Sequence, residues 1–334
     1  MKHVIIGGDG FVGRHLARDL VARDEEVVIA SLEKSDLEIY ERVPFVRVDV
    51  TDPATFDAVP IEADDVVYNL SARMLSPIPP RSQRRDFFYA VNYHGQRNVL
   101  EYMARRDCSR LVYFTTDMVY GPTKFVPQTE DHPKEPLGPY GASKLESETL
   151  CEEYRERGMN ISIFRPRLII GPGRLGILTK LFRLIDLNLP VPVIGNGENP
   201  YQFISVYDCA SACVAAWEKG CPNSAYNLGS LNPPSVKELL SKLIEGAGSR
   251  SFILKTPAGL VKTALTVLDR LGMPLMDPEQ YLIADEVCIV DVSKAERELG
   301  WVPQHRDEDM LLAAYREYRN MRDRGMVAAA PQGG

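Results

Sequence analysis

The sequence lacks both a long apolar run and an excess of basic residues. No apolar segment reaches the roughly 20 residues that a membrane-spanning helix requires, so we expect no membrane span. The chain has 39 Lys and Arg against 46 Asp and Glu, which gives a formal net charge of −7. A nucleic-acid-binding chain usually has a basic face, so we do not expect a nucleic acid as the partner.

A cluster of metal-ligating cysteines is also missing. The six cysteines are scattered along the chain: Cys108, Cys151, Cys209, Cys213, Cys221 and Cys288. Cys209 and Cys213 are one helical turn apart, but no further ligand residues cluster with them. We therefore interpret them as part of a buried helix face and expect no metal site. The first apolar strand follows the N-terminus without a signal-peptide pattern, so we expect a cytoplasmic protein.

A glycine-rich turn lies near the start of the chain. Gly7, Gly10 and Gly13 follow the apolar run Val4-Ile5-Ile6 and precede a helical pattern that begins at Phe11 and Val12. In a dinucleotide-binding turn, such glycines allow a sharp turn, close approach of the backbone to a pyrophosphate, and tight packing of helix on strand. The free N–H groups at the helix start then bind the phosphates. We therefore predict that these five residues contact a dinucleotide.

A tyrosine and a lysine share a helix face further along the chain. Tyr140 and Lys144 are four residues apart at the start of a strongly helical run. A neighbouring ammonium stabilises a phenolate, which makes a tyrosine usable in proton transfer near neutral pH. Thr116 follows the apolar strand at 111–114, at the carboxyl end where doubly wound sheets bind their ligands.

These motifs, in this order, resemble the extended short-chain dehydrogenase/reductases of the NAD-dependent epimerase/dehydratase family. The similarity covers nearly the whole chain. It implies that Thr116, Tyr140 and Lys144 are catalytic: Tyr140 exchanges the hydroxyl proton, Thr116 bonds the same oxygen, and Lys144 holds the cofactor ribose. It also implies further cofactor contacts at Asp49, Val50, Leu70, Ser71, Ala72, Asn92 and Pro166.

The chain departs from its relatives at several substrate positions. Sugar 4,6-dehydratases of the family often have Thr-Asp-Glu where this chain has Thr116-Asp117-Met118, and methionine cannot act as a base, so we expect no dehydratase. An arginine that often binds the substrate diphosphate is replaced by Tyr201. Arg167 is the best substitute cation. We therefore expect Asp117, Met118, Arg167 and Tyr201 to bind the substrate.

The choice between NAD and NADP depends on the end of the second strand. NAD enzymes usually have an acid there that bonds the adenosine ribose, but this chain has Ser31. Glu33 and Lys34 nearby act in opposite directions. No arginine follows the strand, which favours NAD.

Alternating strand and helix patterns predict an α/β fold with a doubly wound parallel sheet and a smaller mixed α/β cap. Strands are expected near 2–6, 26–30, 44–48, 65–70, 110–114 and 161–165. We assign residues 1–170 and 203–230 to the dinucleotide-binding domain, 171–202 and 231–325 to the substrate-binding cap, and 326–334 to a disordered tail. The Arg81–Arg85 run is typical of a solvated helix start.

The resemblance also implies a homodimer, because relatives pair helices near 84–106 and 140–157 across a two-fold axis. Phe87, Phe88, Val91 and Leu150 could support that contact.

The expected activity is that of an NAD(P)-dependent oxidoreductase-type epimerase. A nucleotide-sugar 4-epimerase that works through a transient ketone is the first interpretation. A dehydrogenase or reductase of a hydroxysteroid or another apolar alcohol is the alternative within the enzymes. A cofactor-binding regulatory protein without turnover is the alternative from a different class.

Overall fold

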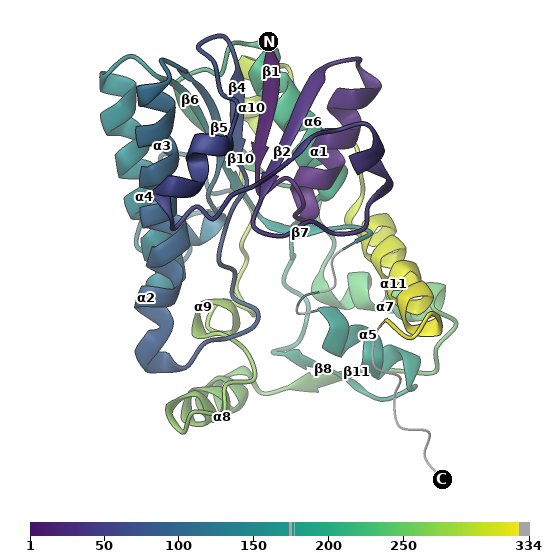
Figure 1. Cartoon of the computed structure of the whole chain (residues 1–334). Coiled ribbons are helices and arrows are strands. Elements are labelled where there is room, and N and C mark those ends of the chain that lie inside the picture. Colours follow the sequence, from purple (N-terminus) through teal and green to yellow (C-terminus); the bar gives the residue numbers. More distant parts are fainter. Residues whose placement is uncertain (174–175, 177, 327–334) are drawn as a thin grey trace.

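A seven-stranded parallel sheet forms the centre of the chain (Figure 1). The computed structural model describes residues 1–173, 176 and 178–326, so the expected tail lies, except for Met326, outside the described residues. The strand order is β10-β6-β5-β4-β1-β2-β3, and every neighbouring pair is parallel. The strands are β1 (Lys2–Ile6), β2 (Glu26–Ser31), β3 (Phe45–Arg47), β4 (Val66–Asn69), β5 (Arg110–Phe114), β6 (Asn160–Pro166) and β10 (Ser224–Leu228). The predicted doubly wound α/β fold and its strands are confirmed.

Helices cover both faces of this sheet because its strands are apolar on both sides. Alternate residues of β1 belong to different cores: Ile5 packs with α1 (Phe11–Ala22) and α6 (Val206–Glu218), whereas Val4 and Ile6 pack with α3 (Gln96–Arg105) and α4 (Pro139–Glu156). Cys209 and Cys213 lie fully buried on α6, as the interpretation of a buried helix face required. The short helix α2 (Arg84–Tyr89) continues into the π-helix at Ala90–Gly95 and packs against α4.

The remaining elements lie below the carboxyl ends of the strands in Figure 1 and form a smaller mixed layer. Two short parallel pairs occur here, β7 (Leu168–Ile170) with β9 (Phe203–Ser205) and β8 (Val191–Ile194) with β11 (Ile253–Thr256). The helices are α5 (Leu178–Asp186), α7 (Val236–Gly246), α8 (Ala258–Arg270), α9 (Pro278–Tyr281) and α11 (Asp307–Asp323).

Short 3-10 helices occupy Glu38–Glu41, Pro53–Ala58, Arg81–Gln83 and Asp117–Val119.

One helix from the C-terminal stretch belongs to the sheet instead of this layer. Helix α10 (Ser293–Leu299) packs beside β10, and Ala295, Leu299 and Trp301 join the core that contains α1 and α6. The C-terminal stretch therefore returns to the sheet at α10 before the chain enters α11.

Three side chains lie deeper than the sequence suggested. Arg84 was expected at a solvated helix start, but it is buried and forms an ion pair with Asp269 of α8. Phe88 packs its ring against Tyr140, with 5.5 Å between ring centres, and Leu150 of α4 lies in the core between that helix and the sheet. Neither apolar side chain is available for a subunit contact, because each is already buried inside its own chain.

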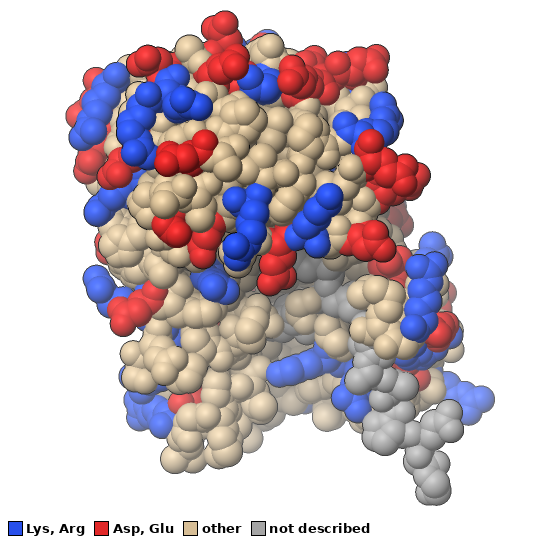
Figure 2. Space-filling view, viewed as in Figure 1, with Lys and Arg blue, Asp and Glu red and all other residues tan. Residues whose placement is uncertain are grey.

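The surface carries mixed charge. Figure 2 shows acidic and basic side chains interspersed on one face. Across the described ranges, no helix combines the length and the apolar character needed to cross a bilayer.

Candidate active site

The glycine turn joins β1 to α1 and lies against the loop after β4. Gly7 has a φ of +76°, and a Cβ there would lie 2.8 Å from the Ser71 backbone nitrogen. A Cβ on Gly13 would lie 2.5 Å from the Cα of Gly8, so the helix start packs directly on the turn. The fold therefore brings the predicted residues Leu70 and Ser71 beside the turn.

The first turn of α1 has no side-chain cap on its main chain. Gly10 is its N-cap residue and provides no side-chain cap, while the side chains of Phe11 and Val12 point into the core. A Cβ on Gly10 would lie 2.9 Å from the Gly7 carbonyl oxygen. The Arg14 guanidinium donates to the Gly10 carbonyl at 3.3 Å and adds positive charge. Uncapped N–H groups and a cradle that side chains would fill are the features that fit a diphosphate.

A carboxylate from the glycine turn lies beside the end of β2. Asp9 accepts hydrogen bonds from the Ser35 hydroxyl at 2.6 Å, from the Ser35 N–H at 3.2 Å, and from the Tyr40 hydroxyl. Lys34 lies over the Tyr40 ring, 4.8 Å from its centre. Ser31 is half-buried at the strand end. A fixed acid thus lies against the loop that follows β2, whereas the strand end itself has Ser31.

Two further predicted cofactor positions have internal partners. The Asp49 carboxylate accepts from the Thr51 N–H and hydroxyl, and these bonds lower its pKa. The neighbouring Val50 contacts the π-helix at Gly95. The amide of Asn92 bonds both backbone groups of Arg73 and the Ser143 hydroxyl, so it joins the loop after β4, which includes Ala72, to α4.

Thr116 caps the 3-10 helix that follows β5. Its hydroxyl accepts from the Met118 N–H at 3.2 Å and donates to Asp117 at 3.2 Å. Lys144 of α4 reaches the same strand end, where its Nζ donates to the Phe114 carbonyl oxygen at 2.9 Å. The structure therefore brings Thr116 and Lys144 together from segments that are 28 residues apart in the sequence.

Tyr140 and Lys144 are both buried on the inner face of α4. The Tyr140 hydroxyl lies 3.7 Å from Met74 Sδ, and its ring packs against Phe88. Burial lowers the pKa of Lys144 to about 7, although nearby Cys151 and Glu148 oppose the shift. An amine that titrates near neutrality can respond to a bound anion or a neighbouring phenol.

A buried polar network packs beside the end of β5. Glu148 accepts from the Thr115 hydroxyl at 2.8 Å and forms a two-pronged ion pair with Arg165, at 2.9 and 2.7 Å. Arg165 also donates to the Tyr120 hydroxyl at 3.0 Å. Sequence reasoning did not assign Glu148, although it lies one turn after Lys144 on the same helix face. That spacing was an available signal.

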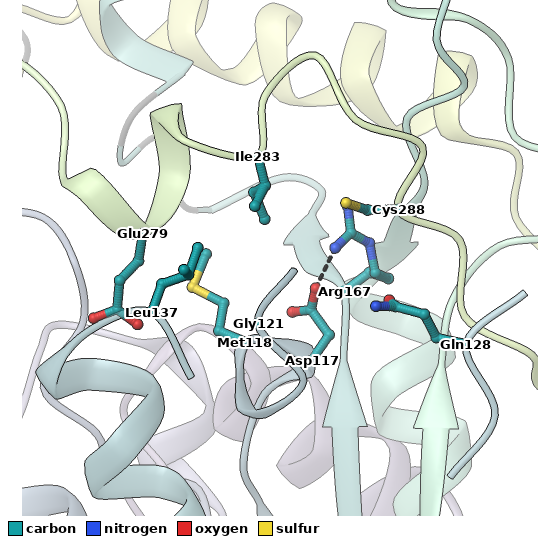
Figure 3. A pocket seen from close by; sticks show the side chains of 9 residues that line it. All are labelled: Asp117, Met118, Gly121, Gln128, Leu137, Arg167, Glu279, Ile283 and Cys288. Atoms are coloured by element: carbon teal, nitrogen blue, oxygen red, sulfur yellow. Dashed lines mark hydrogen bonds and ion pairs between the residues drawn. The ribbon is translucent and has the colours of Figure 1, made fainter. Parts of the chain in front are cut away.

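A narrow pocket lies between the loop after β5 and the cap. Figure 3 shows Asp117, Met118 and Arg167 on its wall, with Leu137, Glu279, Ile283 and Cys288 opposite or beside them. Arg167 follows Pro166 at the end of β6, forms a buried ion pair with Asp117, and lies 5.4 Å from the centre of the Tyr201 ring. The four predicted substrate residues are thus neighbours.

Glu279 is a second residue that sequence reasoning missed. It comes from α9 in the cap, is buried, and accepts hydrogen bonds from the backbone of Tyr140 and Gly141. No local pattern around residue 279 indicates this contact, because the two segments are 139 residues apart in the sequence.

Within the described residues, no group of three or more His, Cys, Asp or Glu side chains could hold a metal ion.

Known proteins share this fold over almost its full length. A putative UDP-glucose 4-epimerase from Methanocaldococcus jannaschii is 27% identical over 90% of this chain and 93% of its own. A dTDP-glucose 4,6-dehydratase from Actinoplanes is 27% identical over 96% of this chain and 98% of its own. The crystal structure of a UDP-glucuronic acid 4-epimerase from Bacillus cereus in complex with NAD superposes with a TM-score of 0.75 at 25% identity, covering 96% of this chain and 99% of that one.

A family model decides the assignment. It describes the NAD dependent epimerase/dehydratase family and matches residues 3–229, more than half of the chain. The resemblance inferred from the sequence motifs is thereby confirmed. The chain belongs to the NAD-dependent epimerase/dehydratase family.

Proposed function

We propose that the protein is an NAD-dependent nucleotide-sugar 4-epimerase. The observation that carries the proposal is the arrangement of three side chains beside a turn that fits a diphosphate. Lys144 reaches the end of β5, which Thr116 follows, and Tyr140 lies buried one turn before Lys144 on α4. The chemistry that bound NAD supplies is reversible acceptance of hydride from a carbinol carbon. The chain's own groups move the hydroxyl proton and hold the substrate.

Each catalytic residue has a distinct task in this proposal. Tyr140 takes the proton from the substrate hydroxyl and later returns it, and Thr116 hydrogen-bonds the same oxygen. Lys144 binds the cofactor ribose and, when protonated, stabilises the Tyr140 phenolate. The transient ketone has to stay in the pocket and turn before the carbinol is formed again.

The carboxylates of the pocket support epimerisation over dehydration. Met118 stands where the dehydratases often have a base, and Asp117 forms an ion pair with Arg167. Both oxygens of Glu279 accept backbone N–H bonds. None of the three side chains offers an uncommitted carboxylate to a carbon-bound proton.

We propose NAD as the cofactor because of Asp9. Its carboxylate is fixed beside the end of β2 by Ser35 and Tyr40 and would repel a 2′-phosphate in that corner. The positive charge of Lys34 opposes this preference. If the Asp9 carboxylate sets the preference, Asp9→Asn should weaken the discrimination between NAD and NADP.

An apolar alcohol is the second candidate substrate. Met118, Leu137 and Ile283 line the pocket, and the Arg167 charge is already paired with Asp117. Such a site could accept a steroid-like or aryl alcohol, and the net reaction would then be that of a dehydrogenase.

A substrate panel tests both candidates. We expect UDP- or GDP-sugars, incubated with NAD-loaded protein, to give a second sugar-nucleotide peak on chromatography. Tyr140→Phe should lower turnover by at least about 10²-fold, since it removes the proton transfer, while the cofactor dissociation constant stays the same. Turnover close to that of the parent chain would remove Tyr140 from the mechanism.

The same panel includes steroid and aryl ketones with reduced cofactor. Bleaching of the cofactor by these ketones, without any sugar product, would select the dehydrogenase instead. If neither class reacts, the regulatory alternative becomes the better interpretation.

A further inference from the structure

The catalytic helix α4 has no cap from its own sequence. Gly138 is the N-cap residue and offers no side chain, and Pro139 has no N–H to be satisfied. The first backbone donors of the helix are therefore those of Tyr140 and Gly141. Glu279 accepts both, from Tyr140 at 2.8 Å on Oε1 and from Gly141 at 2.9 Å on Oε2.

The space for this carboxylate comes from two glycines. A Cβ on Gly138 would lie 2.6 Å from Oε1 of Glu279, and a Cβ on Gly141 would lie 3.0 Å from Oε2. A side chain at either position would thus displace the carboxylate. The close fit indicates that the contact is built into the helix start.

The backbone of Glu279 is fixed in turn. Its N–H donates to Asp277 Oδ1 at 3.0 Å, and Asp277 Oδ2 lies 3.9 Å from Nε of Arg84. Arg84 is also paired with Asp269 of α8, so α8 and α9 are tied to the start of α2. Glu279 itself lines the pocket beside Leu137 (Figure 3).

We propose that Glu279 is a positioning residue for Tyr140. Its carboxylate holds the first turn of the catalytic helix α4 and places a negative charge beside that turn. This rests on the proposed function, in which Tyr140 transfers the proton. Through Glu279, the cap segment α8–α9 sets where Tyr140 stands relative to Thr116. A substrate that shifts the cap also shifts the catalytic tyrosine.

The charge of Glu279 gives the proposal a specific signature. Burial raises the pKa of this carboxyl to about 7, and the bonds from Gly141 and Tyr140 oppose that shift, so it is ionised where a tyrosine titrates. Its negative charge disfavours a phenolate at Tyr140. The other ionisable groups around this helix start are Lys144 of α4, Asp277 of α9, Arg84 of α2 and the Asp117–Arg167 pair, and all of them remain when Glu279 is changed. Lys144, with a pKa of about 7, is neutral where a tyrosine titrates.

The test is a pH titration of Tyr140 in the full-length protein. The tyrosinate absorption of each protein is compared with that of the same protein carrying Tyr140→Phe, so the difference reports Tyr140 among the 15 tyrosines. Glu279→Gln keeps the side-chain size and removes the charge. In the Glu279→Gln variant, we expect the midpoint of the Tyr140 titration to move to lower pH by about half a unit or more. Amide exchange should also become faster in the segment 138–142.

Ser235→Ala is the matched control, because it removes a side-chain cap from another helix, α7, where Ser235 is the N-cap residue. It should lower stability without moving the Tyr140 midpoint or the exchange of 138–142. A midpoint unchanged by Glu279→Gln in a folded chain would overturn the proposal. If that variant does not fold, Gly138→Ala displaces the carboxylate instead, and an unchanged midpoint there would have the same meaning.

This readout needs no substrate, so its failure differs from failure of the proposed function. A chain that epimerises no nucleotide sugar would still show the shift. Where turnover is found, Glu279→Gln should lower kcat about tenfold and leave the NAD dissociation constant unchanged.

Discussion

At the scale of single residues, Lys144 connects protonation with folding stability. Burial lowers its pKa from 10.5 to about 7. At a pH between these two pKa values, the unfolded chain binds more protons at this residue than the folded chain does. The contribution of Lys144 to the free energy of unfolding therefore rises with pH above about 7, with a slope of up to about 1.4 kcal/mol per pH unit.

Lys144→Met should remove this slope. We expect the difference in urea midpoint between the parent and the variant to change steadily from pH 7 to 8.5, since only the parent loses its buried proton there. Equilibrium unfolding at several pH values measures it. If the urea midpoints of the parent and the variant differ by the same amount throughout this range, Lys144 keeps its proton in the folded chain.

At the scale of elements, the glycine turn and α1 form a unit whose function depends on open backbone. Gly10→Val places a branched side chain where the uncapped helix start faces solvent, and its Cβ would lie 2.9 Å from the Gly7 carbonyl. We expect the sheet to fold with unchanged circular dichroism while NAD binding is lost. Titration of nicotinamide fluorescence decides the matter, and tight binding by the variant would place the phosphates elsewhere.

This turn was predictable from the sequence because its signal is local. The glycine spacing, the apolar strand before it, and the four-residue interval between Tyr140 and Lys144 each lie within one element. The contacts of Asp9 with Tyr40, of Arg84 with Asp269, and of Glu279 with α4 join distant segments. Such contacts depend on how elements pack, and they leave no periodicity in the sequence. For that reason Arg84 was wrongly placed in solvent.

At the scale of the whole molecule, we propose a homodimer formed through the outer faces of α2, α3 and α4. Phe88 and Leu150 are excluded from the contact by their burial, whereas Phe87 and Val91 are only partly covered by their own chain. Sedimentation at micromolar concentration should give twice the mass of one chain. Val91→Arg should shift the mass toward that of a monomer, because it introduces a charge at the apolar contact. A monomeric parent chain would contradict the proposal.

The fit between Gly138 and Glu279 also constrains how this sequence can diverge. The close neighbours that a Cβ at position 138 would meet are all atoms of Glu279, whereas one at 141 also meets the Met118 carbonyl oxygen. Position 138 should therefore accept alanine in those homologues that have a shorter side chain at 279. Position 141 should stay glycine in either background. Substitutions at 138 and 279 are thus expected to arise together during evolution, although the two positions are 141 residues apart in the sequence.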